Sequence, residues 1–171
     1  MRTSGAGGLV ALLFATAACS TVTIEANRKP NDPTTLAPVA IVIHQEALHA
    51  AFVQLLGKSL LRQTERRKIP AHLTIITGAE LDEQATIRAA LAGMRGMISL
   101  APAGGKAHLW DARAFVVTDG VPKEAEPIWS ARLDVGGGDA IDQTRNFAEV
   151  MMRDLVDEHV LEGVHGELPK E

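Results

Sequence analysis

Short apolar runs that alternate with helical patterns constrain the fold of this chain more than any other feature. Residues 39–43 form an uninterrupted apolar run, and residues 73–76 form a second run that only Thr74 interrupts. Each run precedes a stretch in which apolar residues recur every three to four positions, at about 46–68 and again up to Met94. A strand, a helix and a second strand in this order require parallel pairing through a right-handed crossover. Continuous apolar strands are also typical of a sheet that is covered on both faces.

Beyond residue 94 the hydrophobic period changes from that of a helix to that of a strand. Residues 97–100 form a third apolar strand, and residues 107–117 and 128–135 alternate between apolar and polar with a hairpin loop between them. Asp139 follows three glycines and is placed to cap a final helix over residues 140–161. The expected order is therefore β-α-β-α-β-β-β-α. It predicts an α/β fold in which helices pack on a mixed sheet.

The first 18 residues have the composition of an export signal. Arg2 is the only charged residue before Cys19, and the apolar run at 5–18 is shorter than the roughly 20 residues that a helix needs to cross a membrane. The run ends in small residues directly before Cys19. We therefore expect residues 1–18 to form a cleaved signal peptide.

The four residues Thr16-Ala17-Ala18-Cys19 resemble the lipobox of bacterial lipoproteins. This resemblance implies cleavage before Cys19, a diacylglycerol thioether on its sulfur, and acylation of the new amino terminus with a fatty acid such as palmitate. Ser20 resembles the residue that sorts such proteins to the outer membrane, so the implied location is the outer membrane, facing the periplasm. Ordinary secretion after cleavage at Ala17 and a cytoplasmic protein with a buried apolar N-terminus are the alternatives. Lipidation would give a use to the only cysteine of the chain, which has no partner for a disulfide.

The rest of the chain divides into a tether, one domain and a tail. Residues 19–38 are polar, contain Pro30, Pro33 and Pro38, and are expected to form a tether, because proline disfavours regular structure. One α/β domain is expected at 38–165 and a polar tail at 166–171. The formal charge is −4, and it becomes −5 without the signal peptide, which holds one arginine and no acid. This mildly acidic balance argues against nucleic acid as a partner and against broad electrostatic docking on anionic lipid.

The organisation of the chain has a second, topological resemblance. A lipidated cysteine, a tether, this order of elements and a strand with Trp129 before the last helix resemble a broad group of envelope lipoproteins. The group includes the periplasmic domain of the curli secretion lipoprotein, the N-terminal domain of TolB and the lipoprotein activators of peptidoglycan synthases. The resemblance covers residues 38–162. It implies a domain that binds an envelope protein or associates with itself and that catalyses no reaction.

The residue patterns do not point to catalysis, to a metal or to a cofactor. His44 and His49 flank Glu46, but two histidines share a helix face at a spacing of four residues, and a spacing of five turns the second ring about 140° away. The three glycines before the last helix resemble a phosphate-binding loop, but Asp139 and Asp142 would repel a phosphate there. We therefore predict no catalytic residues, no metal and no cofactor.

Two groups of residues are candidates for binding a partner. Trp110 and Trp129 lie on the alternating strands, and tryptophan is enriched at binding hot spots, although it is more often a core residue. Arg62, Arg66 and Arg67 form a basic cluster at the end of the first predicted helix. This cluster could meet an acidic partner or lipid headgroups, or it could be solvated and complement the helix dipole.

These observations favour a membrane-anchored envelope lipoprotein that is not an enzyme. Its expected partners are the membrane, through the lipid anchor, and an envelope protein or a second copy of itself. One alternative is a lipid-anchored envelope hydrolase that uses His44, His49 and His108. Another is a small-molecule binding module at the carboxyl ends of the parallel strands, near His44 and residues 77–78.

Overall fold

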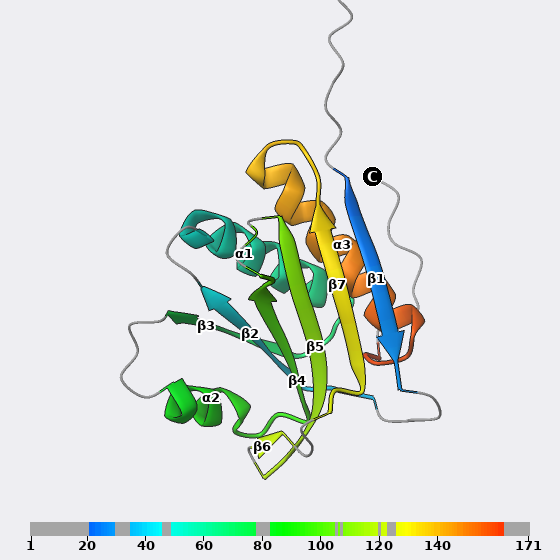
Figure 1. Cartoon of the computed structure of the whole chain (residues 1–171). Helices are drawn as coiled ribbons and strands as arrows, with labels where there is room; N and C mark the ends of the chain where they lie inside the picture. The colour runs from blue at the N-terminus through cyan, green and yellow to red at the C-terminus, as the bar shows by residue number, and fades with distance from the viewer. Residues whose placement is uncertain are drawn as a thin grey trace, which may run out of the picture.

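The computed structural model describes residues 21–29, 35–45, 49–77, 83–104, 106, 108–119, 121–122 and 126–162. The expected signal peptide, the lipobox with Cys19, and the tail at 166–171 lie outside these residues. The expected α/β class with a mixed sheet is confirmed (Figure 1). The elements in chain order are β1 (Val22–Arg28), β2 (Val39–Gln45), α1 (Ala50–Arg66), β3 (Ala71–Thr77), α2 (Glu83–Leu91), β4 (Gly96–Pro102), β5 (Leu109–Thr118), β6 (Val121–Pro122), β7 (Trp129–Val135) and α3 (Ala140–Asp157).

The sheet joins a parallel half to an antiparallel half. Its strands run in the order β1-β7-β5-β4-β2-β3, and the short β6 pairs only with β5. β2 lies between β3 and β4 and is parallel to both, as the two strand–helix–strand units predict. β4, β5, β7 and β1 pair antiparallel in turn. The two edges of the sheet are therefore β1 and β3.

β1 corrects the expectation of a tether over residues 19–38. Residues 22–28 form a strand that pairs with β7 along its whole length, from Val22 opposite Val135 to Arg28 opposite Trp129. The reason is local, because apolar Val22 and Ile24 alternate with Thr23 and Glu25 at the period of a strand. The three prolines of the segment, at 30, 33 and 38, all follow the strand. The folded domain therefore begins at β1 rather than at residue 38.

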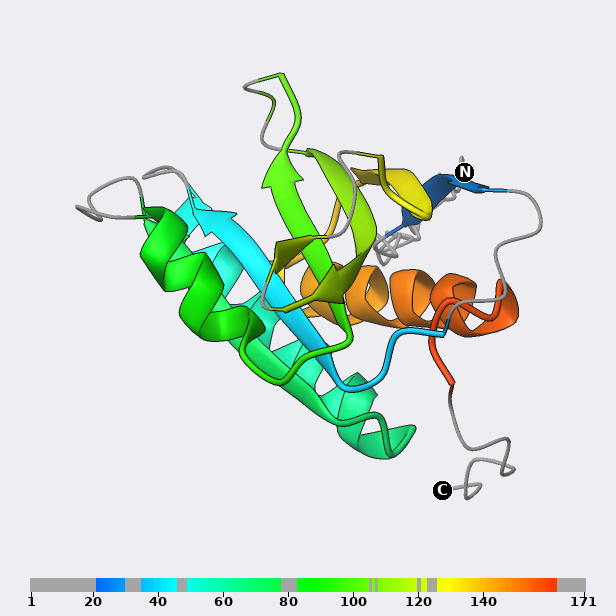
Figure 2. The ribbon, with the colours of Figure 1, turned by 90° about the horizontal axis from the view of Figure 1, so that it is seen from below.

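The main core lies between the sheet and two helices, α1 and α3. These helices pack against each other on one face of the sheet, which we call the inner face (Figure 2). Aromatic side chains fill its middle: Trp110 stacks on Phe52 with ring centroids 5.5 Å apart and meets Phe147 edge-on at 6.0 Å. Trp129 is also fully buried, and its indole Nε1 donates a hydrogen bond of 2.9 Å to Asp154 of α3.

The helix α2 packs on the opposite face, which we call the outer face. Its Leu91 is buried in a second, smaller cluster with side chains of β2, β3, β4 and β5, namely Ala40, Val42, Ile76, Met97 and Val117. This cluster lies at the β3 end of the sheet, where α2 contacts β3 and β2. The parallel half of the sheet is therefore covered on both faces, as its continuous apolar strands predicted. Within the described part of the chain, no helix is long and apolar enough to span a membrane.

Candidate binding surface

The antiparallel half of the sheet is the part on which helices cover only one face. α1 and α3 lie behind β5, β7 and β1 (Figure 2). No described helix covers the outer face of β7, of β1 or of most of β5, and only the end of β5, with Phe115 and Val117, joins the cluster of α2. Their sequences reflect this difference in exposure. Along β7 the residues 129, 131, 133 and 135 are buried, and those between them are exposed or half-buried. Alternation of this kind is what one solvated face of an antiparallel sheet requires.

A row of alternating charge crosses this open outer face from strand to strand. In the register of the sheet, Glu25 of β1 lies opposite Arg132 of β7, and Arg132 lies opposite Asp111 of β5. The Nε of Arg132 donates a hydrogen bond of 3.0 Å to Oδ1 of Asp111. This hydrogen bond, with the charge of the carboxylate, raises the pKa of Arg132. Because Arg132 is exposed and Asp111 is only half-buried, solvent screens the pair, and it fixes the direction of these groups more than it stabilises the fold.

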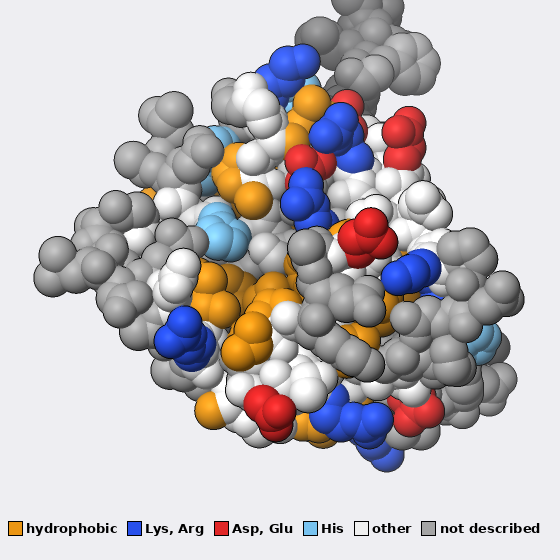
Figure 3. All heavy atoms as spheres, turned by 60° about the horizontal axis from the view of Figure 1, so that its bottom comes forward, with side chains coloured by type: hydrophobic (Ala, Val, Ile, Leu, Met, Phe, Trp, Pro, Cys, Tyr) orange, Lys and Arg blue, Asp and Glu red, His pale blue; other side chains and the backbone are white. Residues whose placement is uncertain are grey.

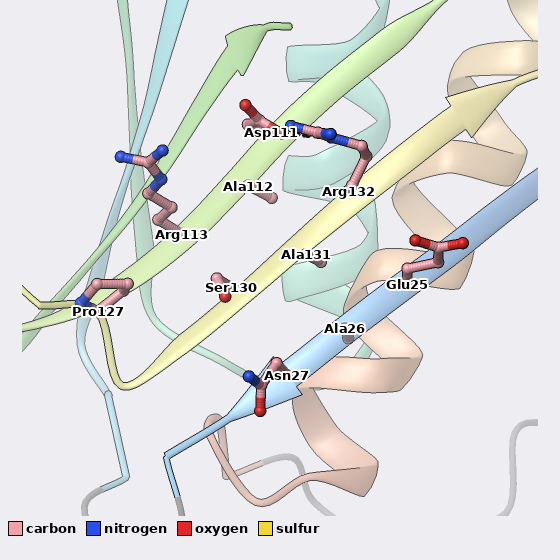
Figure 4. A pocket seen from close by; sticks show the side chains of 10 residues that line it. All are labelled: Glu25, Ala26, Asn27, Asp111, Ala112, Arg113, Pro127, Ser130, Ala131 and Arg132. Carbon is pink, nitrogen blue, oxygen red and sulfur yellow. Dashed lines mark hydrogen bonds and ion pairs between the residues drawn. The ribbon is translucent and has the colours of Figure 1, made fainter.

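A shallow hollow of about 550 Å³ lies over the same strands. Figure 4 shows Arg132 reaching across to Asp111, while Arg113 extends from β5 on the side away from β7 and Glu25 and Asn27 project from β1. We call this hollow with its charged row the open-face groove. Its lining consists of Glu25, Ala26, Asn27, Asp111, Ala112, Arg113, Pro127, Ser130, Ala131 and Arg132.

The groove presents charge of both signs beside a hydrophobic area. In Figure 3, hydrophobic side chains gather in the left centre of the view, and Lys, Arg, Asp and Glu side chains gather to the right, on the side where Figure 1 places β1. A small-molecule site is usually enclosed and mostly apolar. A wide, polar and shallow surface on a rigid sheet instead suits an extended partner that makes many polar contacts.

The structure places both candidate tryptophans in the core. Trp110 and Trp129 are fully buried on the inner face of β5 and β7, so neither indole is accessible to a partner. The interpretation of these residues as core is the one that the fold supports. The reason is that the helix pair α1–α3 covers the face to which they point.

The candidate arginines lie at the end of α1, which packs on the inner face, with Arg67 as its C-cap. Arg62 and Arg66 are exposed, so both remain available for binding. Arg67 is half-buried and donates hydrogen bonds to the carbonyl oxygen and the side-chain oxygen of Gln63. Partial burial lowers the pKa of Arg67, and the carboxylate of Glu149 on α3 opposes this shift. The cluster and the open-face groove therefore belong to different faces of the molecule.

The histidines singled out from the sequence do not gather into a site. His44 is the penultimate residue of β2, lies on the outer face and is half-buried. His49 is buried, with its ring 5.8 Å from that of Trp110 in an edge-on arrangement. His108 is exposed before β5. In the part of the chain that the structure describes, there is no group of three His, Cys, Asp or Glu side chains that could hold a metal ion. Residues 46–48 and 78–82, beside the proposed small-molecule site, lie outside the described residues.

The charged residues of the groove were not identified as a site from the sequence. A local signal did exist, because Asp111 and Arg113, like Arg132 and Asp134, alternate with apolar neighbours and so share one face of their strands. The predicted hairpin already pairs β5 with β7, and what the sequence lacks is the position of β1 beside β7.

Comparison with known proteins gives little further information. No protein-family model matches the chain, and no curated protein matches it. Among solved structures, it is similar to a dodecamer of a PelC point variant from Paraburkholderia phytofirmans, with 15% identity and a TM-score of 0.46 over 84% of this chain and 99% of that chain. A second PelC dodecamer from the same organism gives 16% identity and a TM-score of 0.42 over the same shares. Superpositions this loose do not assign the chain to a family.

Proposed function

We propose that this chain is a membrane-anchored envelope lipoprotein whose α/β domain binds a protein partner, or supports an envelope assembly, without catalysing a reaction. Lipid on Cys19 would hold it at the outer membrane, on the periplasmic side. The observation that carries the binding role is the open-face groove, a rigid and solvated half-sheet with a fixed row of charges from Glu25 to Asp111. Surfaces of this kind set specificity through charge complementarity.

The anchor is tested by the intact mass of the protein extracted from membranes. The expected product begins at Cys19 and carries the added mass of a diacylglycerol and a further acyl chain. Cys19→Ser should remove that mass and move the protein out of the membrane fraction. A wild-type mature protein without acyl mass would refute the anchor and leave the binding role to be judged separately.

The binding role is tested by photo-crosslinking in the envelope. A photoreactive residue in place of Arg113, in the groove, should capture a discrete product that mass spectrometry can identify. The matched control replaces Lys58, which is exposed on α1 and faces away from the groove. Charge reversal by Arg132→Glu should weaken capture at position 113, since it breaks the pair with Asp111. Equal products from positions 113 and 58 would contradict a specific role for the groove.

A further inference from the structure

The outer edge of β1 carries backbone groups that no described strand pairs. β1 lies at the edge of the sheet, and its one neighbouring described strand is β7 (Figure 1). The ladder between them continues one residue past each end of β1, because Gly136 N donates to Thr21 O at 2.7 Å and Lys29 N donates to Ile128 O at 2.8 Å. The register is unbroken over this length, so β1 contains no bulge. Residues 21–29 contain no proline either. Bulges and prolines are devices by which edge strands usually avoid pairing with another chain.

The hydrogen bonds at Thr21 and Lys29 determine which backbone groups point outward. In an antiparallel ladder, hydrogen-bonded pairs alternate with pairs that are not hydrogen-bonded. Since residues 21 and 29 are both bonded to β7, the odd-numbered residues of β1 direct their backbone groups toward β7. The even-numbered residues Val22, Ile24 and Ala26 therefore direct their N–H and C=O groups to the free edge. Ala26 is exposed, and Val22 and Ile24 are half-buried at the margin of the core.

We propose that a second copy of this chain pairs with β1 antiparallel, across a two-fold axis at Ile24, so that one sheet continues through both copies. This inference deepens the proposed function by naming the partner in the assembly, and it rests on that proposal only for its biological role. The free edge supplies the hydrogen bonds, and an isologous contact of this kind closes as a dimer.

Side-chain matching favours this register over registers with the axis at Glu25, Ala26 or Asn27. With the axis at Ile24, Thr23 lies opposite Glu25 of the second copy, and no like charges face each other. On the inner face, Ile24 meets its own copy and Val22 meets Ala26, so apolar groups at the margin of the core become covered. About seven residues of each strand overlap, from 21 to 27.

The competing registers are less favourable. An axis at Glu25 places two carboxylates opposite each other, and an axis at Ala26 places Ile24 opposite Arg28. An axis at Asn27 pairs Glu25 with Lys29, but it shortens the overlap because Ile24 then faces Pro30, which has no N–H.

The same geometry is compatible with two lipid anchors in one membrane. The two-fold axis of an antiparallel pair is perpendicular to the sheet. Because a rotation leaves the position along its axis unchanged, both copies of Thr21 lie at the same level along this axis and can face the same membrane. They are about 20 Å apart along the strands, since Thr21 lies opposite Asn27 of the second copy. Cys19 precedes Thr21 by two residues in each copy.

Two matched carboxylates test the register in the full chain, purified in detergent and followed by sedimentation across a range of concentrations. Thr23→Glu places a new carboxylate opposite Glu25 twice in the dimer and should raise its dissociation constant about fivefold or more. Asn27→Glu adds the same charge to the same exposed face of β1 but lies opposite Thr21, and it should leave the dissociation constant nearly unchanged. If Asn27→Glu weakened the dimer more than Thr23→Glu, the axis at Ile24 would be wrong.

A proline tests the backbone pairing itself. Ala26→Pro removes an N–H at the free edge without removing a hydrogen bond to β7, so it should abolish the dimer and leave the circular dichroism spectrum unchanged.

A pair of cysteines tests the register by crosslinking. In mixtures, Thr23→Cys and Glu25→Cys chains should form a disulfide-linked heterodimer faster than either forms a homodimer. The unaltered chain is the control for disulfides that form through Cys19. A monomer at all concentrations, an assembly larger than a dimer, or a dimer that forms only after removal of residues 163–171 would each overturn the proposal. None of these outcomes changes the crosslinking expected at position 113, so the binding role of the groove is tested independently of the dimer.

Discussion

Gly96 shows at the scale of a single residue how closely the start of β4 packs. A Cβ atom added at Gly96 would lie well inside the van der Waals distance of the Cβ of Leu36, which is fully buried. At Gly57 of α1, an added Cβ would meet only the end of the Leu73 side chain, at 2.7 Å from its Cδ2. Leu73 can rotate away, whereas the Cβ of Leu36 can move only with its backbone.

We therefore expect Gly96→Ala to lower the free energy of unfolding by about 1–3 kcal/mol, because the site is overpacked. Gly57→Ala is the matched control, also a buried glycine that becomes alanine. It should change stability by less than about 1 kcal/mol, because the higher helix propensity of alanine offsets the contact with Leu73. Denaturant unfolding monitored by tryptophan fluorescence measures both variants. Equal destabilisation of the two would show that the contact with Leu36 relaxes easily.

The hydrogen bond between Trp129 and Asp154 is a second feature at the scale of the residue. It joins β7 to α3 at 2.9 Å, and the indole that donates it is fully buried. Asp154→Ala leaves this N–H without its acceptor and should cost about 1–2 kcal/mol of stability. The same change in a Trp129→Phe background should cost much less, since no donor is left to satisfy. A cost that is the same in both backgrounds would assign the effect of Asp154 to the helix rather than to the indole.

Sequence patterns predicted most elements, and the exceptions have a physical cause. The alternation of β5 and β7 and the period of α1 and α3 are local signals. β1 was missed because its partner β7 lies more than 100 residues away and because only three of its seven residues are apolar. An edge strand that is half-buried has a weak local pattern, and the prolines that follow it suggest irregular structure. The burial of Trp110 and Trp129 likewise depends on which face the helices cover, which periodicity alone does not determine.

The cap of α3 is a local signal that the structure confirms. Oδ1 of Asp139 accepts hydrogen bonds from the backbone N–H groups of Ile141 and Asp142, both at 2.9 Å. α1 begins without such a cap, since its N-cap residue His49 makes no side-chain capping hydrogen bond. Asp139→Ala should therefore lower the free energy of unfolding by about 1 kcal/mol, and Asp139→Asn should preserve most of it. Denaturant titration of the unaltered chain and the two variants measures these differences. An asparagine variant as unstable as the alanine variant would argue against capping by Asp139.

At the scale of the whole molecule, strand order creates the features that the sequence could not predict. Glu25 is far in the chain from Arg132 and Asp111 and becomes their neighbour only because β1 pairs with β7. The open-face groove depends on β1 in the same way, because β1 forms one side of it. The segment that the sequence indicated as a tether is thus required both for the candidate surface and for the sheet.

Truncation tests this role of β1 directly. A chain that begins at residue 38, where the sequence predicted the domain to start, loses the ladder with β7 and exposes core residues that Val22 and Ile24 cover. Half-burial of two such side chains contributes about 2 kcal/mol, so the shortened chain should be less stable by at least that amount. A chain that begins at residue 21 retains the ladder and is the control. Because the described contacts of β1 run to β7 and α3, protection from hydrogen exchange should fall first in those two elements. If both truncated chains unfolded at the same denaturant concentration, the segment would be the tether that its prolines suggested.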